Sequence, residues 1–215
     1  MFPLRDTLAA EQPFESGLRD RNKMRTRLRL NSEAIRLFAE HGYDNTSVQD
    51  IADAAEVSLR TLFRYFDGKE EILFARDYDL SEFFDNLTHQ PATVPALHAV
   101  RAAYTQQRAP THEETDLVLR FHRAVAGNAA LEGRFLQLQH RFRQQLSHAL
   151  AKRAGRRKPQ DADEVAAATA QTLLDLAFSR WIDRGGRGSL TRVVDNMIST
   201  LDEISSGTTE STATA

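Results

Sequence analysis

The segment 47–66 places side chains that could read DNA bases next to side chains that must be buried. In its second half Leu62 and Phe66 lie four residues apart, which is the spacing of one helix face. If that face packs inward, the side chains left to point outward from a short helix are Leu59, Arg60, Thr61 and Arg64. Guanidinium groups there match the O6 and N7 acceptors of guanine in a major groove. The pattern also fits an ordinary helical hairpin with a solvated polar face.

Positive charge gathers just before this segment. Residues 19–36 hold seven basic side chains, Arg25 and Arg27 among them, against two acidic ones, although the chain has a formal net charge of −2. Such a cluster favours phosphate, because binding releases counterions from DNA; a solvated helix face is the alternative. Downstream, Tyr65 and Lys69 lie near the start of the next expected helix, where they could hold a phosphate.

Helices are the elements expected to position these groups. Apolar residues recur at spacings of three and four, and no alternating β-branched and aromatic run is bounded by hairpin turns. The sequence therefore predicts an all-α fold of about nine helices. They are expected at residues 23–41, 47–55, 59–65, 68–89, 95–108, 112–126, 128–154, 162–184 and 189–205. Thr46, followed by Gln49, has the spacing of a capping box for the second helix.

Composition favours a globular chain and excludes several kinds of site. Hydrophobic residues make up 41% and charged residues 27% of the chain, and cysteine is absent. Disulfides, thiolate nucleophiles and cysteine-ligated metals are thereby excluded. No apolar run approaches the ~18–20 residues of a membrane span, and the first residues lack a signal-peptide pattern. We expect a cytoplasmic protein with no membrane partner.

Catalytic and cofactor motifs are missing from the sequence. It contains no glycine-rich phosphate loop, no Gly-x-Ser-x-Gly, no His-Glu-x-x-His and no pair of Glu-x-x-His motifs for a di-iron bundle. His112, Glu113 and Glu114 are consecutive, so they cannot face one metal ion on a regular helix. We expect no enzymatic activity, no cofactor and no metal. A helical-bundle enzyme is the alternative, which stoichiometric bound metal would favour.

Residues 30–73 resemble the DNA-binding domain of TetR-family transcriptional repressors. The matching residues are Ala34, Leu37, Phe38, Ala39, Gly42, Tyr43, Thr46, Val48, Ile51, Ala52, Ala55, Val57, Ser58, Thr61, Leu62, Phe63, Tyr65, Phe66, Lys69, Glu70 and Leu73. The family often has Gly where this chain has Glu56, and Tyr where it has Phe63. Without the hydroxyl, the Phe63 ring can pack internally or against a thymine methyl. The candidate DNA contacts are Arg25, Arg27, Ser47, Gln49, Leu59, Arg60, Thr61, Phe63, Arg64, Tyr65 and Lys69.

The resemblance also implies an order of domains. We expect a flexible basic arm at 1–23, a DNA-binding domain at 24–84 with its helix-turn-helix at 47–66, an effector-binding and dimerisation domain at 85–205, and a disordered tail at 206–215. In the family the last two helices pair with their copies in a four-helix bundle. A homodimer would then meet a palindromic double-stranded operator. Phe178 and Val194 are expected to lie in that interface.

A small-molecule effector is implied as well. Candidate pocket residues are Phe84, Tyr104, Arg120, Phe121, His122, Gln139 and Phe178. Ordinary core packing is the alternative for the rings, and a hydrogen-bonded core histidine is the alternative for His122. Two segments, Arg-Thr-Leu-Phe-Arg-Tyr-Phe and Arg-Trp-Ile-Asp-Arg-Gly-Gly, are similar to the mycofactocin-regulator-like subgroup, with which acyl-CoA effectors are associated. The expected function is a repressor released by an apolar or amphipathic effector; a regulator controlled by a protein partner is the alternative.

Overall fold

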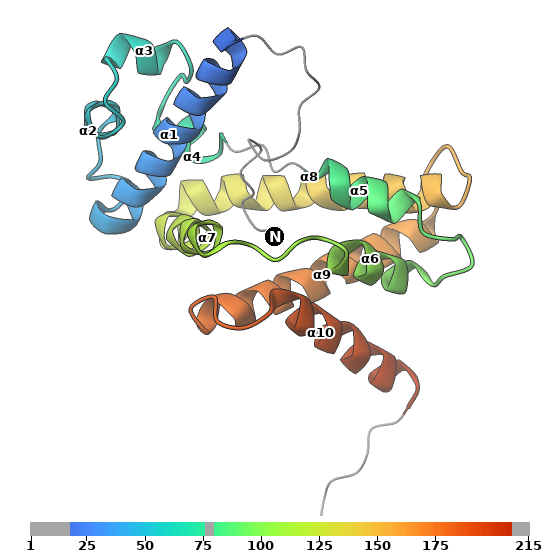
Figure 1. The fold of residues 1–215 in the computed structure, drawn as a ribbon. Helices are drawn as coiled ribbons and strands as arrows, with labels where there is room; N and C mark the ends of the chain where they lie inside the picture. Colours follow the sequence, from blue (N-terminus) through green and yellow to red (C-terminus); the bar gives the residue numbers. More distant parts are fainter. Residues whose placement is uncertain (1–17, 76–79, 208–215) are drawn as a thin grey trace, which may run out of the picture. The chain divides into compact units, whose positions relative to one another are not determined.

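The computed structural model describes residues 18–75 and 80–207. Within these ranges the chain forms ten α-helices and no β-strand (Figure 1). The predicted all-α class is confirmed. Most of the expected arm and tail, at 1–23 and 206–215, lies outside the described residues. None of the described helices is both long enough and apolar enough to cross a membrane.

Most helices begin and end within three residues of the predicted positions, but the first begins at Leu18, five residues before its predicted start and inside the segment expected to be a flexible arm. They are α1 (Leu18–His41), α2 (Val48–Ala54), α3 (Leu59–Phe63), α4 (Lys69–Leu73), α5 (Ser81–Thr88), α6 (Ala96–Thr105), α7 (His112–Val125), α8 (Ala129–Arg153), α9 (Asp161–Asp183) and α10 (Leu190–Ser205). The expected single helix at 68–89 is wrong. Helix α4 ends after Leu73, because Phe74 takes φ −95° and ψ 11° and the N–H of Ala75 turns to the Ile72 carbonyl. No glycine or proline marks this break in the sequence.

The cap of α2 differs from the expected one. Ser47, not Thr46, precedes the helix, and its Oγ accepts a hydrogen bond from the Asp50 N–H at 3.1 Å. The Asp50 carboxylate accepts the Ser47 N–H at 2.8 Å, and this bonding lowers the pKa of Asp50. The buried hydroxyl of Thr46 donates instead to the Gly42 carbonyl at 2.9 Å. Thr46 is therefore a structural residue of the loop between α1 and α2.

Two compact units make up the described chain. The helix-turn-helix unit contains described residues 18–75 together with 110–137, so α7 and the beginning of α8 group with α1–α4. The C-terminal unit contains 80–109 and described residues 138–207. These units are defined by contacts between residues, not by function. The expected functional boundary after residue 84 therefore stays a prediction.

Helix α1 organises the helix-turn-helix unit by packing against α2, α4 and α7 (Figure 1). Its buried face consists of Leu30, Ala34, Ile35, Leu37 and Phe38. Each large apolar side chain buried in this way contributes about 1.5–3 kcal/mol. Gly42 ends the helix at φ +88°, a left-handed conformation that favours glycine, and donates its N–H to the Phe38 carbonyl at 3.0 Å.

Helices α9 and α10 pack closely against each other in the C-terminal unit, and both contact α6. Trp181 is fully buried there and donates its indole N–H to the Gly188 carbonyl at 3.1 Å. Phe178 and Val194 are also buried, at 3% and 1% exposure. The expectation that these two residues form the dimer interface is wrong, because they already pack inside a single copy of the chain.

Candidate nucleic-acid interface and ligand residues

Helices α2 and α3 form the expected helix-turn-helix. Ile51 of α2 and Leu62 of α3 are fully buried, and the two helices contact each other. Between them Glu56 takes φ +50°, and the Val57 N–H donates to the Ala52 carbonyl at 2.9 Å. Ser58 then caps α3, because its Oγ accepts the Thr61 N–H at 3.1 Å. The turn thus holds α3 in one orientation against α2.

The orientation of α3 decides which side chains face outward. Successive residues of a helix are rotated by about 100°, so Arg60 and Arg64 lie opposite the buried Leu62. Both arginines are exposed. Leu59 and Phe63 lie one turn apart on one flank of this exposed face. Leu59 is half-buried and Phe63 is 49% exposed, so the ring of Phe63 is not packed internally.

The two outward arginines differ in their surroundings. Arg64 donates to the Tyr65 hydroxyl at 3.2 Å, and its Cζ lies 5.0 Å from the centroid of the Tyr65 ring. Within the described part of the chain, no group accepts a hydrogen bond from the Arg60 guanidinium. Arg60 therefore keeps all of its side-chain donors for a ligand, whereas Arg64 is oriented along Tyr65. The half-buried Thr61 hydroxyl lies 2.9 Å from the Ser58 hydroxyl.

Ser47 and Gln49, two of the predicted DNA contacts, are exposed at the start of α2. Their contact with DNA stays a prediction. Both already make local hydrogen bonds. The Ser47 hydroxyl donates to the Asp50 carboxylate at 2.7 Å, and the Gln49 amide donates to the Asp53 carboxylate at 2.8 Å. A DNA contact by either side chain would compete with these bonds.

Lys69 is held inside the helix-turn-helix unit. Its ammonium donates to the carbonyl oxygens of Tyr43 at 2.7 Å and Thr46 at 3.1 Å, and lies 4.3 Å from the Tyr43 ring centroid. These contacts tie the first turn of α4 to the loop before α2. An ammonium has three donors, so one remains for an outside group. The phosphate contact of Lys69 stays a prediction. The two hydrogen bonds to carbonyls also give Lys69 a structural role, since they position α4 against the loop before α2.

The basic cluster of α1 is only partly available to DNA. Arg25 is exposed, whereas Arg27 is half-buried with its Cζ 5.0 Å from the Phe66 ring centroid. Arg29 pairs with Glu56 at 3.4 Å. Arg36 donates to the carboxylates of Glu33 at 2.9 Å and Glu40 at 2.7 Å, and the hydrogen bond to Glu33 raises the pKa of Arg36. Counting charges along the sequence could not find these pairs, since two of the acids lie outside the counted segment.

Three of the expected ligand residues lie on α7 in the helix-turn-helix unit. Arg120 pairs with Asp116 at 2.7 Å and with Glu40 of α1 at 3.2 Å. Phe121 is buried in edge contact with Phe74. Next to it, the His122 ring lies 5.8 Å from the Phe135 ring, and burial lowers the pKa of His122 to about 4. Phe121 and His122 thus belong to one aromatic cluster, and Arg120 links α7 to α1.

The other four candidates lie in the C-terminal unit. The Phe84 ring packs against Phe83 and Phe142, at centroid distances of 5.2 Å and 5.9 Å. Phe178 packs against Trp181 at 5.7 Å. Tyr104 is buried and Gln139 is half-buried. The seven candidates are thus divided between the two units, and their roles stay predictions.

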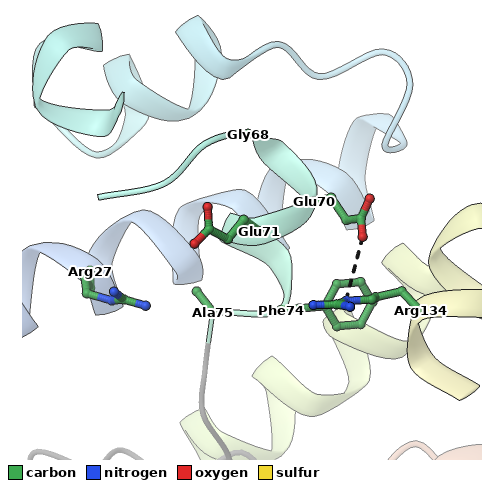
Figure 2. Close-up of a pocket in the computed structure, with 7 residues that line it drawn as sticks. All are labelled: Arg27, Gly68, Glu70, Glu71, Phe74, Ala75 and Arg134. Atoms are coloured by element: carbon green, nitrogen blue, oxygen red, sulfur yellow. Dashed lines mark ion pairs between the residues drawn. The ribbon is translucent and has the colours of Figure 1, made fainter. Parts of the chain in front are cut away.

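A surface hollow of about 370 Å³ lies in the helix-turn-helix unit, and sequence reasoning did not identify it. Figure 2 shows Glu70 and Glu71 of α4 between Arg27 of α1 and Arg134 of α8, with Arg134 3.8 Å from Glu70. Its lining is completed by Gly68, Phe74 and Ala75. Because two arginines face two glutamates, the hollow offers a ligand no net charge. None of the seven candidate ligand residues lines it.

Comparison with known proteins identifies the class of this domain. Residues 31–75 match the family model described as bacterial regulatory proteins, tetR family. The HTH-type transcriptional regulator TcmR of Streptomyces glaucescens is 41% identical over 93 residues, which cover 43% of this chain but only 41% of that relative. MftR of Mycobacterium tuberculosis, named for the regulation of mycofactocin biosynthesis, is 28% identical over 176 residues, or 79% of this chain and 84% of the relative. The fatty acid degradation regulator FadR from Bacillus halodurans shares the fold at TM-score 0.52 and 17% identity, over 80% of this chain and 92% of that chain.

Proposed function

The chain belongs to the TetR family of bacterial regulatory proteins, and from this premise we propose that it represses transcription as a homodimer on a palindromic operator. A small-molecule effector releases it. The observation that carries the DNA-binding part is the pair Arg60 of α3 and Arg64, the C-cap residue of that helix, which are exposed one turn apart and point away from the buried Leu62. Bidentate guanidinium contacts to guanine are the commonest specific contacts in a major groove.

A homodimer is supported by the outer surface of the last two helices. Val165 and Leu176 of α9 are large apolar residues that are 65% and 47% exposed. A hollow of about 350 Å³ between α9 and α10 is lined by Arg180, Arg184, Val193, Asn196, Met197, Ser199, Thr200 and Glu203. A second copy packed on this surface would cover both apolar side chains. Two helix-turn-helix units held about 34–36 Å apart would then meet successive major grooves.

We assign the effector an apolar or amphipathic character. Within the helix-turn-helix unit, the candidate Phe121 packs against Phe74, and the neighbouring His122 adds a polar group that is neutral at physiological pH because burial lowers its pKa to about 4. The similarity to a regulator named for mycofactocin biosynthesis supports the subgroup resemblance. Acyl-CoA thioesters are therefore the first molecules to test.

Footprinting tests the proposal on the DNA around the protein's own gene. We expect one protected palindrome, lost in the Arg60→Ala/Arg64→Ala double variant and weakened by an acyl-CoA of the right chain length. A 100-fold loss of affinity requires about 2.7 kcal/mol of coupling between effector and operator. Absence of any protected site would contradict the proposal. Protection that no effector changes would favour a regulator controlled by a protein partner.

A further inference from the structure

An apolar strip runs along the flank of α3, next to the two arginines. Its members are Leu59 and Phe63, one turn apart, with Leu59 half-buried and Phe63 49% exposed. Phe63 is one of only six large apolar side chains exposed in the described part of the chain. Burial of apolar surface is favourable, yet about half of the Phe63 surface stays open to solvent on α3. What distinguishes Phe63 from the other five is its position beside the two outward arginines, where a bound partner would also contact the ring.

A partner that contacts this strip must also be complementary to the positive charges of Arg60 and Arg64. Arg60 lies about 100° around the helix from Leu59, and Arg64 lies about 100° from Phe63. The apolar strip and the two arginines can therefore face one groove together. Two guanidinium groups favour an anionic, acceptor-rich surface, which the major groove of DNA provides. The apolar group that this groove offers is the 5-methyl group of thymine. A hydrophobic protein surface would leave the Arg60 guanidinium without any acceptor, which burial penalises.

We propose that Leu59 and Phe63 determine specificity by packing against the 5-methyl group of thymine in each operator half-site, beside a guanine read by Arg60. The inference rests on the proposed operator binding and names the base chemistry that it recognises. It assigns the half-site a thymine adjacent to a guanine, because the two strips lie side by side on one short helix. Phe63 can fill this role because its ring, lacking a hydroxyl, has no polar group to place against a phosphate.

The test uses the full-length protein and an operator duplex selected from random DNA. In the selected duplex each thymine is replaced, one position at a time, by deoxyuridine, which differs only by the missing methyl group. We expect one thymine per half-site whose replacement weakens binding about fourfold, as for one lost apolar contact of methyl size. Replacement by 5-bromodeoxyuridine, whose bromine has about the size of a methyl group, should restore affinity.

Side-chain variants connect the base to the residue. In Phe63→Ala the replacement of that thymine by deoxyuridine should have no effect, whereas Arg60→Ala should keep the fourfold discrimination and lose preference for the adjacent guanine. Circular dichroism should show Phe63→Ala to be folded, since its ring lies outside the core. If deoxyuridine were tolerated at every position by the parent protein, or if Phe63→Ala kept the discrimination, the inference would be overturned while operator binding stood. Failure to select any duplex would contradict both.

Discussion

The guanidinium of Arg29 in α1 contacts Glu56 in the turn between α2 and α3 twice. Its Nη1 lies 3.4 Å from the Glu56 carboxylate, and its Nη2 donates to the Glu56 backbone carbonyl at 3.4 Å. Glu56 is the non-glycine residue with positive φ among the described residues. Glu56, at a position where the family often has glycine, therefore has two opposite effects. It links the turn to α1, but its side chain makes the positive φ of the turn less favourable. The pair contributes little by itself, because Glu56 is 83% exposed and screened by solvent.

Replacing Glu56 by glycine should therefore stabilise the protein. Glycine adopts φ +50° without the cost of roughly 1 kcal/mol that other residues incur, whereas an exposed ion pair is worth about 0.2–1 kcal/mol. We expect Glu56→Gly to raise the free energy of unfolding by up to about 0.5 kcal/mol in urea titrations. Arg29→Ala serves as the matched variant and should destabilise the parent more than it destabilises Glu56→Gly. A loss of more than about 1 kcal/mol in Glu56→Gly would show that the link outweighs the strain.

Arg60 should contribute to sequence discrimination. Its guanidinium is exposed opposite Leu62, and Arg60→Ala should cost about 1–3 kcal/mol on the cognate operator and much less on random DNA. Binding titrations on both DNAs at three salt concentrations measure the difference. Arg25→Ala is the control, since an arginine that contacts only phosphate weakens both complexes alike. Equal losses on both DNAs for Arg60→Ala would contradict the placement of α3 in the groove.

Lys69 should affect both stability and DNA binding. Removing its ammonium takes donors from the carbonyls of Tyr43 and Thr46, so Lys69→Met should lower the free energy of unfolding by about 1–2 kcal/mol. If the third donor holds a phosphate, affinity for cognate and random DNA should fall by similar factors. The slope of log K against log salt should then decrease by about one.

Lys152→Met, at an exposed lysine of the C-terminal unit, is the control for the loss of one positive charge. It should leave the free energy of unfolding and the salt slope as in the parent. A Lys69→Met variant that lost stability but kept the parent's salt slope would assign Lys69 a purely structural role.

Charge on the outer face of α9 should separate the homodimer. Val165 and Leu176 are exposed and do not belong to the core, so Val165→Glu/Leu176→Glu should stay folded and become monomeric by light scattering. The buried Phe178 is the contrasting site, where Phe178→Glu should unfold the C-terminal unit by placing a charge in its core. A folded double variant that remained dimeric would exclude α9 from the interface.

Acidification should destabilise the protein through His122. Burial lowers its pKa from 6.5 to about 4 in the folded state, so between these values the unfolded chain binds a proton that the folded chain does not. The free energy of unfolding should therefore be constant above about pH 6.5 and fall by up to about 3 kcal/mol as the pH drops to 4. Urea titrations of the parent, His122→Phe and the surface control His140→Gln at pH 7, 5.5 and 4.5 measure this. Equal pH dependence in the parent and His122→Phe would exclude His122 as the cause.

Sequence patterns alone were enough to predict the fold class and which side chains of the helix-turn-helix point outward. Apolar spacing located the buried faces of α1, α2 and α10, because helix periodicity is local and survives without tertiary information. The positions of Leu62 and Arg60 on opposite faces of α3 follow from the same rule. Local signals missed the end of α4 after Leu73, where no glycine or proline marks a break, and they placed the cap of α2 at Thr46 instead of Ser47.

Which polar groups are already paired, and which apolar groups are buried, depends on how the helices pack together. The links from Arg29 to Glu56, from Lys69 to Tyr43 and from Arg120 to Glu40 join residues 27, 26 and 80 positions apart in the chain. No spacing rule connects such pairs, because their distance is set by helix packing. The same holds for the exposure of Phe63 and the burial of Phe178, since an aromatic residue has the same sequence signal in a core and on a binding surface.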